Sequence, residues 1–120
     1  MKTKNLEIGH LGEVIAKRYL QNKGYRIVKE NYRTKYAEID LITYNKDILV
    51  FIEVKTRKDE QLGTPEESIN RYKIKKLIRN AEAYAARMSY AGECRIDAVC
   101  IVLDEKGRAS RIDHYENITL

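Results

Sequence analysis

The spacing of apolar residues near the start of the chain predicts an amphipathic helix. At about 100° per residue, seven side chains fall on one broad face: Ile8, Leu11, Val14, Ile15, Ala16, Tyr19 and Leu20. Gly24 is expected to end this helix. Glu13 falls at the margin of the apolar face, so its carboxylate is expected to point toward the elements that pack against this helix.

Five later stretches have the character of strands. They cover residues 25–32, 37–44, 48–57 and 94–103, with a short fifth strand at 111–115. The second and third are expected to form a hairpin, because Asn45-Lys46-Asp47 between them is a turn signal. The apolar density of residues 48–54 is typical of a central strand that is covered on both faces.

A second helix is expected between the third and fourth strands. Thr64-Pro65-Glu66-Glu67 supplies an N-cap, a proline at the first helical position and a glutamate for a capping box, so the helix should run from there to about Met88. The segment is long enough for a crossover, which makes the two strands parallel. The sequence therefore predicts an α/β fold of order α-β-β-β-α-β-β, a mixed sheet of about five strands flanked by helices, as a single domain over residues 1–120.

Composition narrows the class of partner. The net charge of +5 favours a polyanion such as nucleic acid. The longest aliphatic and aromatic run, residues 48–52, is too short to cross a membrane, and no apolar stretch follows the N-terminal lysines, so we expect a cytoplasmic protein without a membrane partner. Cys94 and Cys100 lie too far apart in one strand to pair, and both are expected to be buried, reduced thiols.

Acidic residues in the expected hairpin are the candidate chemistry. Glu38 and Asp40 share one face of their strand, as Glu53 and Lys55 do on the next. A two-residue loop would set Glu38 opposite Glu53, and a four-residue loop would set Asp40 opposite Glu53. A three-residue loop would separate the acids onto two faces unless a bulge restored the phase.

If these acids meet, they need a cation to neutralise them. Hard oxygen ligands suit Mg²⁺ or Mn²⁺, and such sites cleave phosphodiesters, with Lys55 orienting or deprotonating the attacking water. The alternative is a structural role in which Glu53 and Lys55 form ion pairs across neighbouring strands. A Glu-x-Lys spacing alone indicates such an ion pair more often than an active site. A partly buried Glu53 and Lys55, the acidic pair on the preceding strand and a basic helix nearby favour the catalytic interpretation.

The segments Glu38-Ile39-Asp40-Leu41-Ile42 and Phe51-Ile52-Glu53-Val54-Lys55-Thr56-Arg57 resemble the PD-(D/E)XK nuclease superfamily. A fuller pattern resembles the small YraN-like proteins, which are similar to Holliday-junction resolvases. That pattern consists of Gly12-Glu13, Ala16, Tyr19-Leu20, Gly24-Tyr25, Asn31-Tyr32-Arg33, Lys73, Lys76 and Arg95-Ile96-Asp97. The resemblance implies a restriction-endonuclease-like core in which Asp40 and Glu53 bind the metal, Lys55 is the catalytic lysine and Glu13 completes the site. Ala37 departs from the pattern, since these proteins usually have glycine there.

Basic residues surround these motifs. Arg57 and Lys58 follow the Glu-x-Lys and are candidates for contacts to the phosphate backbone. Five more candidates for nucleic-acid contacts are Arg33, Lys35, Lys73, Lys76 and Arg79. As an alternative, the basic helix residues form an ordinary solvated surface.

These observations favour a divalent-metal-dependent endonuclease that hydrolyses phosphodiester bonds in DNA, including branched or structured DNA. The alternative is a noncatalytic nucleic-acid-binding module that retains the nuclease fold. A small dimeric interaction protein is a third hypothesis. The similarity to junction resolvases also implies a homodimer, because these enzymes cut two strands with two sites.

Overall fold

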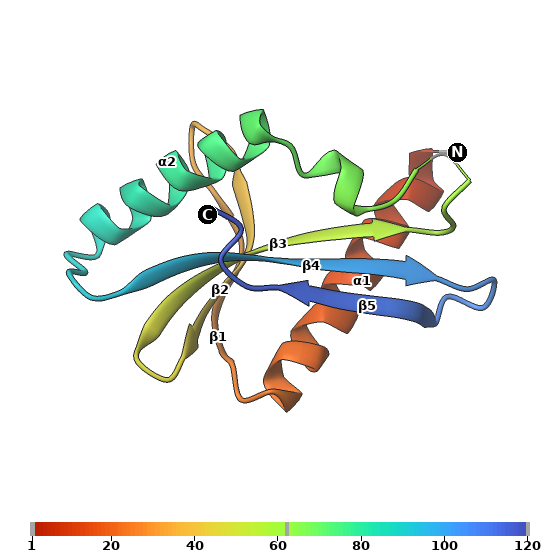
Figure 1. Cartoon of the computed structure of the whole chain (residues 1–120), viewed down its shortest axis with the longest axis horizontal. Helices are drawn as coiled ribbons and strands as arrows, with labels where there is room; N and C mark the ends of the chain where they lie inside the picture. The colour runs from red at the N-terminus through yellow and green to blue at the C-terminus, as the bar shows by residue number, and fades with distance from the viewer. Residues whose placement is uncertain (1, 62, 120) are drawn as a thin grey trace.

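The computed structural model describes residues 2–61 and 63–119. Helices and strands follow one another along the chain in the expected order (Figure 1). The elements are α1 (Lys2–Asn22), β1 (Arg26–Arg33), β2 (Glu38–Asn45), β3 (Ile48–Arg57), the 3₁₀ helix η1 (Glu66–Ser68), α2 (Arg71–Arg87), β4 (Cys94–Leu103) and β5 (Ala109–Tyr115). The prediction of a mixed α/β fold with five strands is confirmed.

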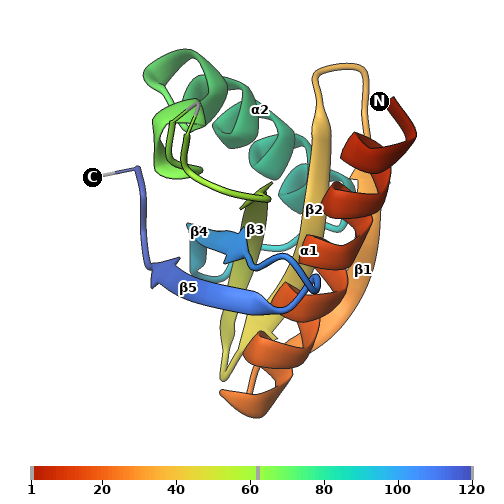
Figure 2. The same cartoon turned by 90° about the vertical axis from the view of Figure 1, so that its right-hand side faces the viewer.

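The five strands form one sheet in the order β1-β2-β3-β4-β5. β3 and β4 are parallel, as the crossover through α2 requires, and the other neighbouring pairs are antiparallel. The two helices lie on opposite faces of the sheet (Figure 2). Under α1 the core includes Ala16, Leu20, Leu41, Ile52 and Val99, and under α2 it includes Leu77, Ala81, Tyr84, Ile42 and Phe51.

The β2–β3 hairpin has a two-residue loop, but its position differs from the expected one. Asn45 pairs with Ile48, so the loop is Lys46-Asp47, and Lys46 adopts a left-handed conformation with φ 56°. β2 continues one residue farther than expected, to Asn45, whereas β3 begins at Ile48 as expected. The last β2–β3 pair is Leu41 with Ile52, and continuing this register would set Asp40 opposite Glu53. We had expected that alignment from a four-residue loop, and the observed two-residue loop produces it because it begins one residue later.

The predicted start of the second helix was wrong. Thr64 and Pro65 precede only the single turn η1, and α2 begins at Arg71 after an extended Asn70. The Asn70 side chain caps α2, because it accepts a hydrogen bond from Lys73 N–H at 2.9 Å. The Glu66 carboxylate accepts hydrogen bonds from Arg111 and Tyr115 of β5.

α1 approaches β3 closely at Gly12. A Cβ added to Gly12 would overlap Oγ1, Cβ and Cγ2 of Thr56, so only glycine fits there without a shift. Gly9, one turn earlier, has open space where a Cβ would lie. The close contact at Gly12 therefore fixes the depth at which the following residue, Glu13, lies against the sheet.

The two cysteines differ in their surroundings. Cys100 is buried on β4, and burial raises the pKa of its thiol to about 12. Cys94 is exposed, so the expectation of two buried thiols was wrong for this residue. Cys94 is the first residue of β4, at an end of the strand that the core does not cover.

Neither helix in the described part of the chain is long and apolar enough to cross a membrane.

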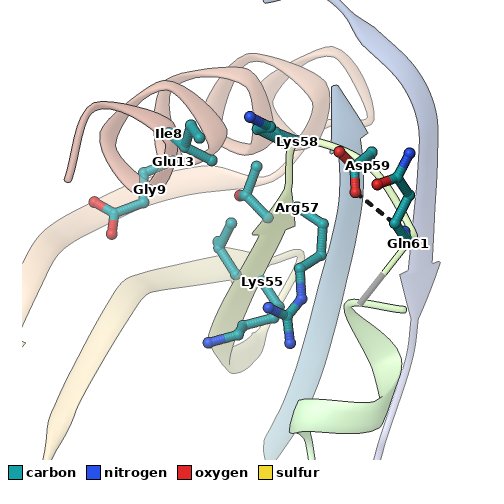
Figure 3. A pocket seen from close by; sticks show the side chains of 10 residues that line it. Ile8, Gly9, Glu13, Lys55, Arg57, Lys58, Asp59 and Gln61 are labelled. Carbon is teal, nitrogen blue, oxygen red and sulfur yellow. Dashed lines mark hydrogen bonds between the residues drawn. The ribbon is translucent and has the colours of Figure 1, made fainter. Parts of the chain in front are cut away.

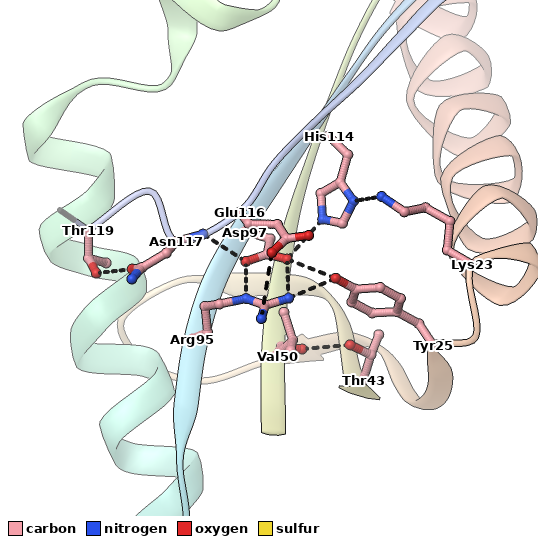
Figure 4. Close-up of polar contacts among 10 residues, drawn as sticks. All are labelled: Lys23, Tyr25, Thr43, Val50, Arg95, Asp97, His114, Glu116, Asn117 and Thr119. Atoms are coloured by element: carbon pink, nitrogen blue, oxygen red, sulfur yellow. Dashed lines mark hydrogen bonds and ion pairs between the residues drawn. The ribbon is translucent and has the colours of Figure 1, made fainter. Parts of the chain in front are cut away.

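A buried polar network joins β4, β5 and the end of α1 (Figure 4). The fully buried Asp97 accepts hydrogen bonds from Arg95 Nε at 2.8 Å, His114 Nε2 at 2.8 Å and Asn117 N–H at 3.0 Å. Lys23 Nζ lies 2.7 Å from His114 Nδ1, which assigns the imidazole proton to Nε2. Burial raises the pKa of Asp97, but these hydrogen bonds outweigh it, and the net effect is a lowered pKa.

The contrast between two glycines of α1 gives a matched test of the helix–sheet contact. Gly12→Ala should lower the free energy of unfolding by about 2 kcal/mol, because its methyl group overlaps Thr56. Gly9→Ala should raise the free energy of unfolding by about 0.5 kcal/mol, since alanine favours the helix and no atom lies within 4 Å of its Cβ position. Urea unfolding monitored by circular dichroism measures both. Equal stability of the Gly12→Ala variant and the natural sequence would contradict the close contact.

The Asp97 network predicts a stability change that depends on pH. Asp97→Asn should cost about 3 kcal/mol at neutral pH, because Arg95 and His114 lose a buried anionic partner. A carboxyl group whose pKa is lowered on folding stabilises the protein above its unfolded pKa of about 4 and loses this effect as the pH falls through the folded value. The difference in unfolding free energy should therefore shrink in acid. A loss that is the same at acidic and neutral pH would contradict this role.

Candidate metal centre and cationic pocket

The candidate site lies where β2 separates from β3. Pairing between the two strands ends at Leu41 and Ile52, and the next β2 residue, Asp40, uses its side chain instead. Asp40 Oδ2 accepts a hydrogen bond from the backbone N–H of Val54 at 2.7 Å. The side chain thus satisfies a backbone donor at the point of separation and is held there in one position.

Three carboxylates converge at this point. Glu13 of α1 meets Glu38 and Asp40 of β2, and one ligand oxygen from each lies within 4.8 Å of the other two. We call these three residues the carboxylate cluster. Glu38 is paired with Arg33 at 3.1 Å, whereas no cation lies within 4.0 Å of Glu13 or Asp40 among the described residues. Oxygen donors that crowd together without compensation suit a hard divalent cation.

Asn31 holds part of the cluster. Its Nδ2 donates to Glu13 Oε1 at 2.9 Å and lies 3.5 Å from Glu38 Oε1. Asn31 has φ 51°, a left-handed conformation that asparagine tolerates better than most residues. The sequence pattern included Asn31 but did not reveal this role, because a left-handed residue inside a strand has no signal in the hydrophobic pattern.

Glu53, predicted as a metal ligand with Asp40 and Glu13, lies beside Asp40 but belongs to a different contact. It is buried, with 4% of its surface exposed, and its Oε2 is 2.8 Å from Lys73 Nζ of α2. The structure brings Glu13 and Asp40 together as expected and adds Glu38. Lys73, which is predicted to contact nucleic acid, neutralises Glu53 in this structure and keeps 38% of its side chain exposed.

The electrostatics of the site follow from burial and crowding. Burial and then the adjacent Glu53 carboxylate raise the pKa of Asp40 far above its usual range. Burial and then the nearby Lys73 ammonium lower the pKa of Lys55, although Glu53 and Asp40 act in the opposite direction. Both groups are therefore held in surroundings that disfavour their charged forms, a feature that is common at functional sites.

A pocket of about 630 Å³ opens beside the carboxylate cluster, between α1 and the end of β3 (Figure 3). We call it the cationic pocket; its lining includes Gly9 and Glu13 from α1, Lys55 and Arg57 from β3, and Lys58 just beyond the strand. Lys55 and Arg57 lie two residues apart near the end of β3, where burial is only partial, and their side chains project to the same side. The catalytic lysine implied by the resemblance therefore lies in the wall that the cluster and the pocket share.

The remaining predicted nucleic-acid residues lie farther out. Lys35 is exposed in the β1–β2 loop, and Lys76 and Arg79 are exposed on α2. Asn80 Nδ2 donates to the backbone oxygen of Ala37 at 3.0 Å, which ties this loop to α2.

Fold and site together define a mixed α/β protein in which the central antiparallel strands separate around three carboxylates. The chain belongs to the uncharacterised protein family UPF0102, whose family model matches residues 12–101, and this is the YraN-like family that the motifs resemble. The matched range contains the carboxylate cluster, Glu53, Lys55 and Lys73.

Relatives cover almost the whole chain. A UPF0102 protein of Alkaliphilus oremlandii is 43% identical over 117 residues, which are 94% of this chain and 97% of the relative. A UPF0102 protein of Alkaliphilus metalliredigens is 41% identical over 111 residues (92% and 94%). One of Pelotomaculum thermopropionicum is 38% identical over 111 residues, 92% of each chain.

Crowding at Asp40 predicts that removing one charge stabilises the metal-free protein. Asp40→Asn keeps an oxygen that can accept from Val54 N–H and should raise the free energy of unfolding in EDTA at neutral pH by about 1 kcal/mol or more. The raised pKa penalises folding only above the unfolded value of about 4, so the gain should disappear in mild acid. Urea unfolding at both pH values measures this gain. A variant that is less stable than the natural sequence at neutral pH would contradict it.

Proposed function

We propose that this protein is a cytoplasmic, divalent-metal-dependent endonuclease that hydrolyses phosphodiester bonds in DNA. The observation that carries the proposal is the convergence of Glu13, Glu38 and Asp40 beside Lys55, at the point where β2 leaves β3. The resemblance of the two strand motifs to the PD-(D/E)XK nuclease superfamily supports the same chemistry. Belonging to UPF0102 is compatible with this activity but does not specify it.

The residues present fit a Mg²⁺ or Mn²⁺ ion. Glu13 and Asp40 offer carboxylate oxygens without a cationic partner among the described residues, and Glu38 offers a third within 4.8 Å of both. Glu53 is the predicted further ligand, and it would exchange its contact with Lys73 for one with the ion. A bound ion would neutralise charge on the scissile phosphate and acidify a water molecule.

Lys55 is the proposed proton acceptor. It has no carboxylate within 4.0 Å among the described residues, and its lowered pKa makes the neutral amine more accessible near neutral pH. In the proposed reaction, a water oxygen bonds to phosphorus, its proton passes to neutral Lys55 Nζ, and the bond from phosphorus to the leaving oxygen breaks. The leaving oxygen takes a proton from solvent, which gives a phosphate on one strand end and a hydroxyl on the other.

The distribution of charge supports DNA as the substrate. The net charge is +5, and exposed basic residues are present on the β1–β2 loop, which precedes Glu38, and on α2. Such residues add sequence-independent affinity for phosphates. By the same resemblance to junction resolvases, we propose a homodimer with two sites, and light scattering tests this assembly.

Activity should require both the cluster and Lys55. With Mg²⁺ or Mn²⁺, the protein should cut at least one labelled substrate among a four-way junction, a flap, a duplex and a single strand. Asp40→Asn and Lys55→Ala should each slow cutting by about 100-fold or more, because one removes a metal ligand and the other the proton acceptor. Gel analysis of cutting rates measures this loss.

A matched control removes a carboxylate elsewhere. Glu82 is exposed on α2, and Glu82→Gln should cut at the rate of the natural sequence. Calorimetric titration should show that Asp40→Asn weakens Mn²⁺ binding whereas Glu82→Gln does not. Absence of Mn²⁺ binding, with DNA held equally well by the natural sequence and by both site variants, would contradict catalysis and favour the noncatalytic binding module. Cutting that survives in both site variants would show that the activity belongs to a contaminant.

A further inference from the structure

The cationic pocket holds more positive charge than its own carboxylates neutralise. Lys55, Arg57 and Lys58 all line it, and none of them has a carboxylate within 4.0 Å among the described residues. The acidic groups in the lining are Glu13, which is turned toward Asn31, and Asp59, which accepts from Gln61 N–H at 3.0 Å. The pocket is therefore suited to an anion.

Arg57 gives the most specific indication of a ligand. Its Nε is buried and has no hydrogen-bond partner within the part of the chain that the structure describes. An unpaired buried donor is costly, and an arginine fork matches the geometry of a phosphate group. Arg57 also follows Lys55 on the same side of β3, so a phosphate on Arg57 would lie next to the proposed reaction centre.

The α1 side of the cationic pocket has room for a group larger than a phosphate. Gly9 lies one helical turn before Glu13 on the same face of α1, and nothing lies within 4 Å of the place where its Cβ would be. The volume of about 630 Å³ is in the usual range for pockets that hold small organic molecules. In a continuous duplex the bases are paired and turned inward, so only a phosphate and its sugar could enter.

We propose that the cationic pocket binds one unpaired nucleotide next to the scissile phosphate, with its own phosphate on Arg57. This inference rests on the proposed function, because it assumes that the carboxylate cluster faces a nucleic-acid strand. It assigns the substrate class: DNA with a single-stranded segment at the cut, such as a flap, an overhang or the open centre of a branch.

Fluorescence anisotropy in EDTA tests the pocket without any metal-dependent cutting. The probes are a labelled blunt duplex and the same duplex with a single-stranded overhang. The natural sequence should bind the overhang probe about tenfold more tightly, and Arg57→Gln should remove this preference. Because one phosphate contact is lost, Arg57→Gln should also reduce the slope of log affinity against log salt by about 0.7 for the overhang probe.

A second variant blocks the pocket without removing charge. Gly9→Leu should fold, since its side chain meets open space and favours the helix, but it should lose the preference for the overhang probe. His10→Leu adds the same bulk at the exposed neighbouring position, and Arg18→Gln removes an exposed arginine elsewhere on α1. Both controls should keep the preference.

The outcomes separate this inference from the proposed function. Equal affinity for both probes, or a preference that survives in Arg57→Gln and Gly9→Leu, would overturn the nucleotide pocket even if metal-dependent cutting occurs. A preference that is lost in these two variants and kept in the controls would support the pocket, whatever the cutting assay shows.

Discussion

The separation of β2 from β3 at Asp40 is the constraint on which the site depends. Because the Asp40 carboxylate accepts from Val54 N–H, it is held in a half-buried position instead of turning to solvent. Glu38, Glu53 and Glu13 come to it from three different elements, β2, β3 and α1. Bringing negative groups together in this way is unfavourable without a cation, and under the proposed function a bound metal ion would offset this cost.

Contacts on both faces of the sheet maintain this arrangement. On one face, the absence of a side chain at Gly12 lets α1 approach Thr56, and this approach sets the position of Glu13. On the other face, Lys73 of α2 neutralises the buried Glu53. This ion pair occupies Oε2 of Glu53, so the first turn of α2 holds in place a side chain that lies beside Asp40.

The sequence predicted the element order, the parallel crossover and the meeting of acids from β2 because each has a periodic or local signal. The hairpin register needed a choice between loops that differ by a single residue, and β2 extended into the turn signal as far as Asn45. The start of α2 was wrong because the chain leaves the helical conformation at Ile69 and Asn70, and Asn70 caps a new helix. The Lys73–Glu53 pair and the open space beside Gly9 likewise depend on tertiary geometry that no local pattern encodes.

The central claim is that the carboxylate cluster is a divalent-metal site. Anomalous diffraction from crystals soaked in Mn²⁺ tests it most directly, because the signal locates the ion without assuming any activity. The account predicts a peak bonded to oxygens of Asp40 and Glu13 at about 2.1 Å, with Glu38 or Glu53 as a further ligand. Crystals that show no peak at these carboxylates, with Asp40 still bound to Val54 N–H and the soaked ion present elsewhere, would contradict it.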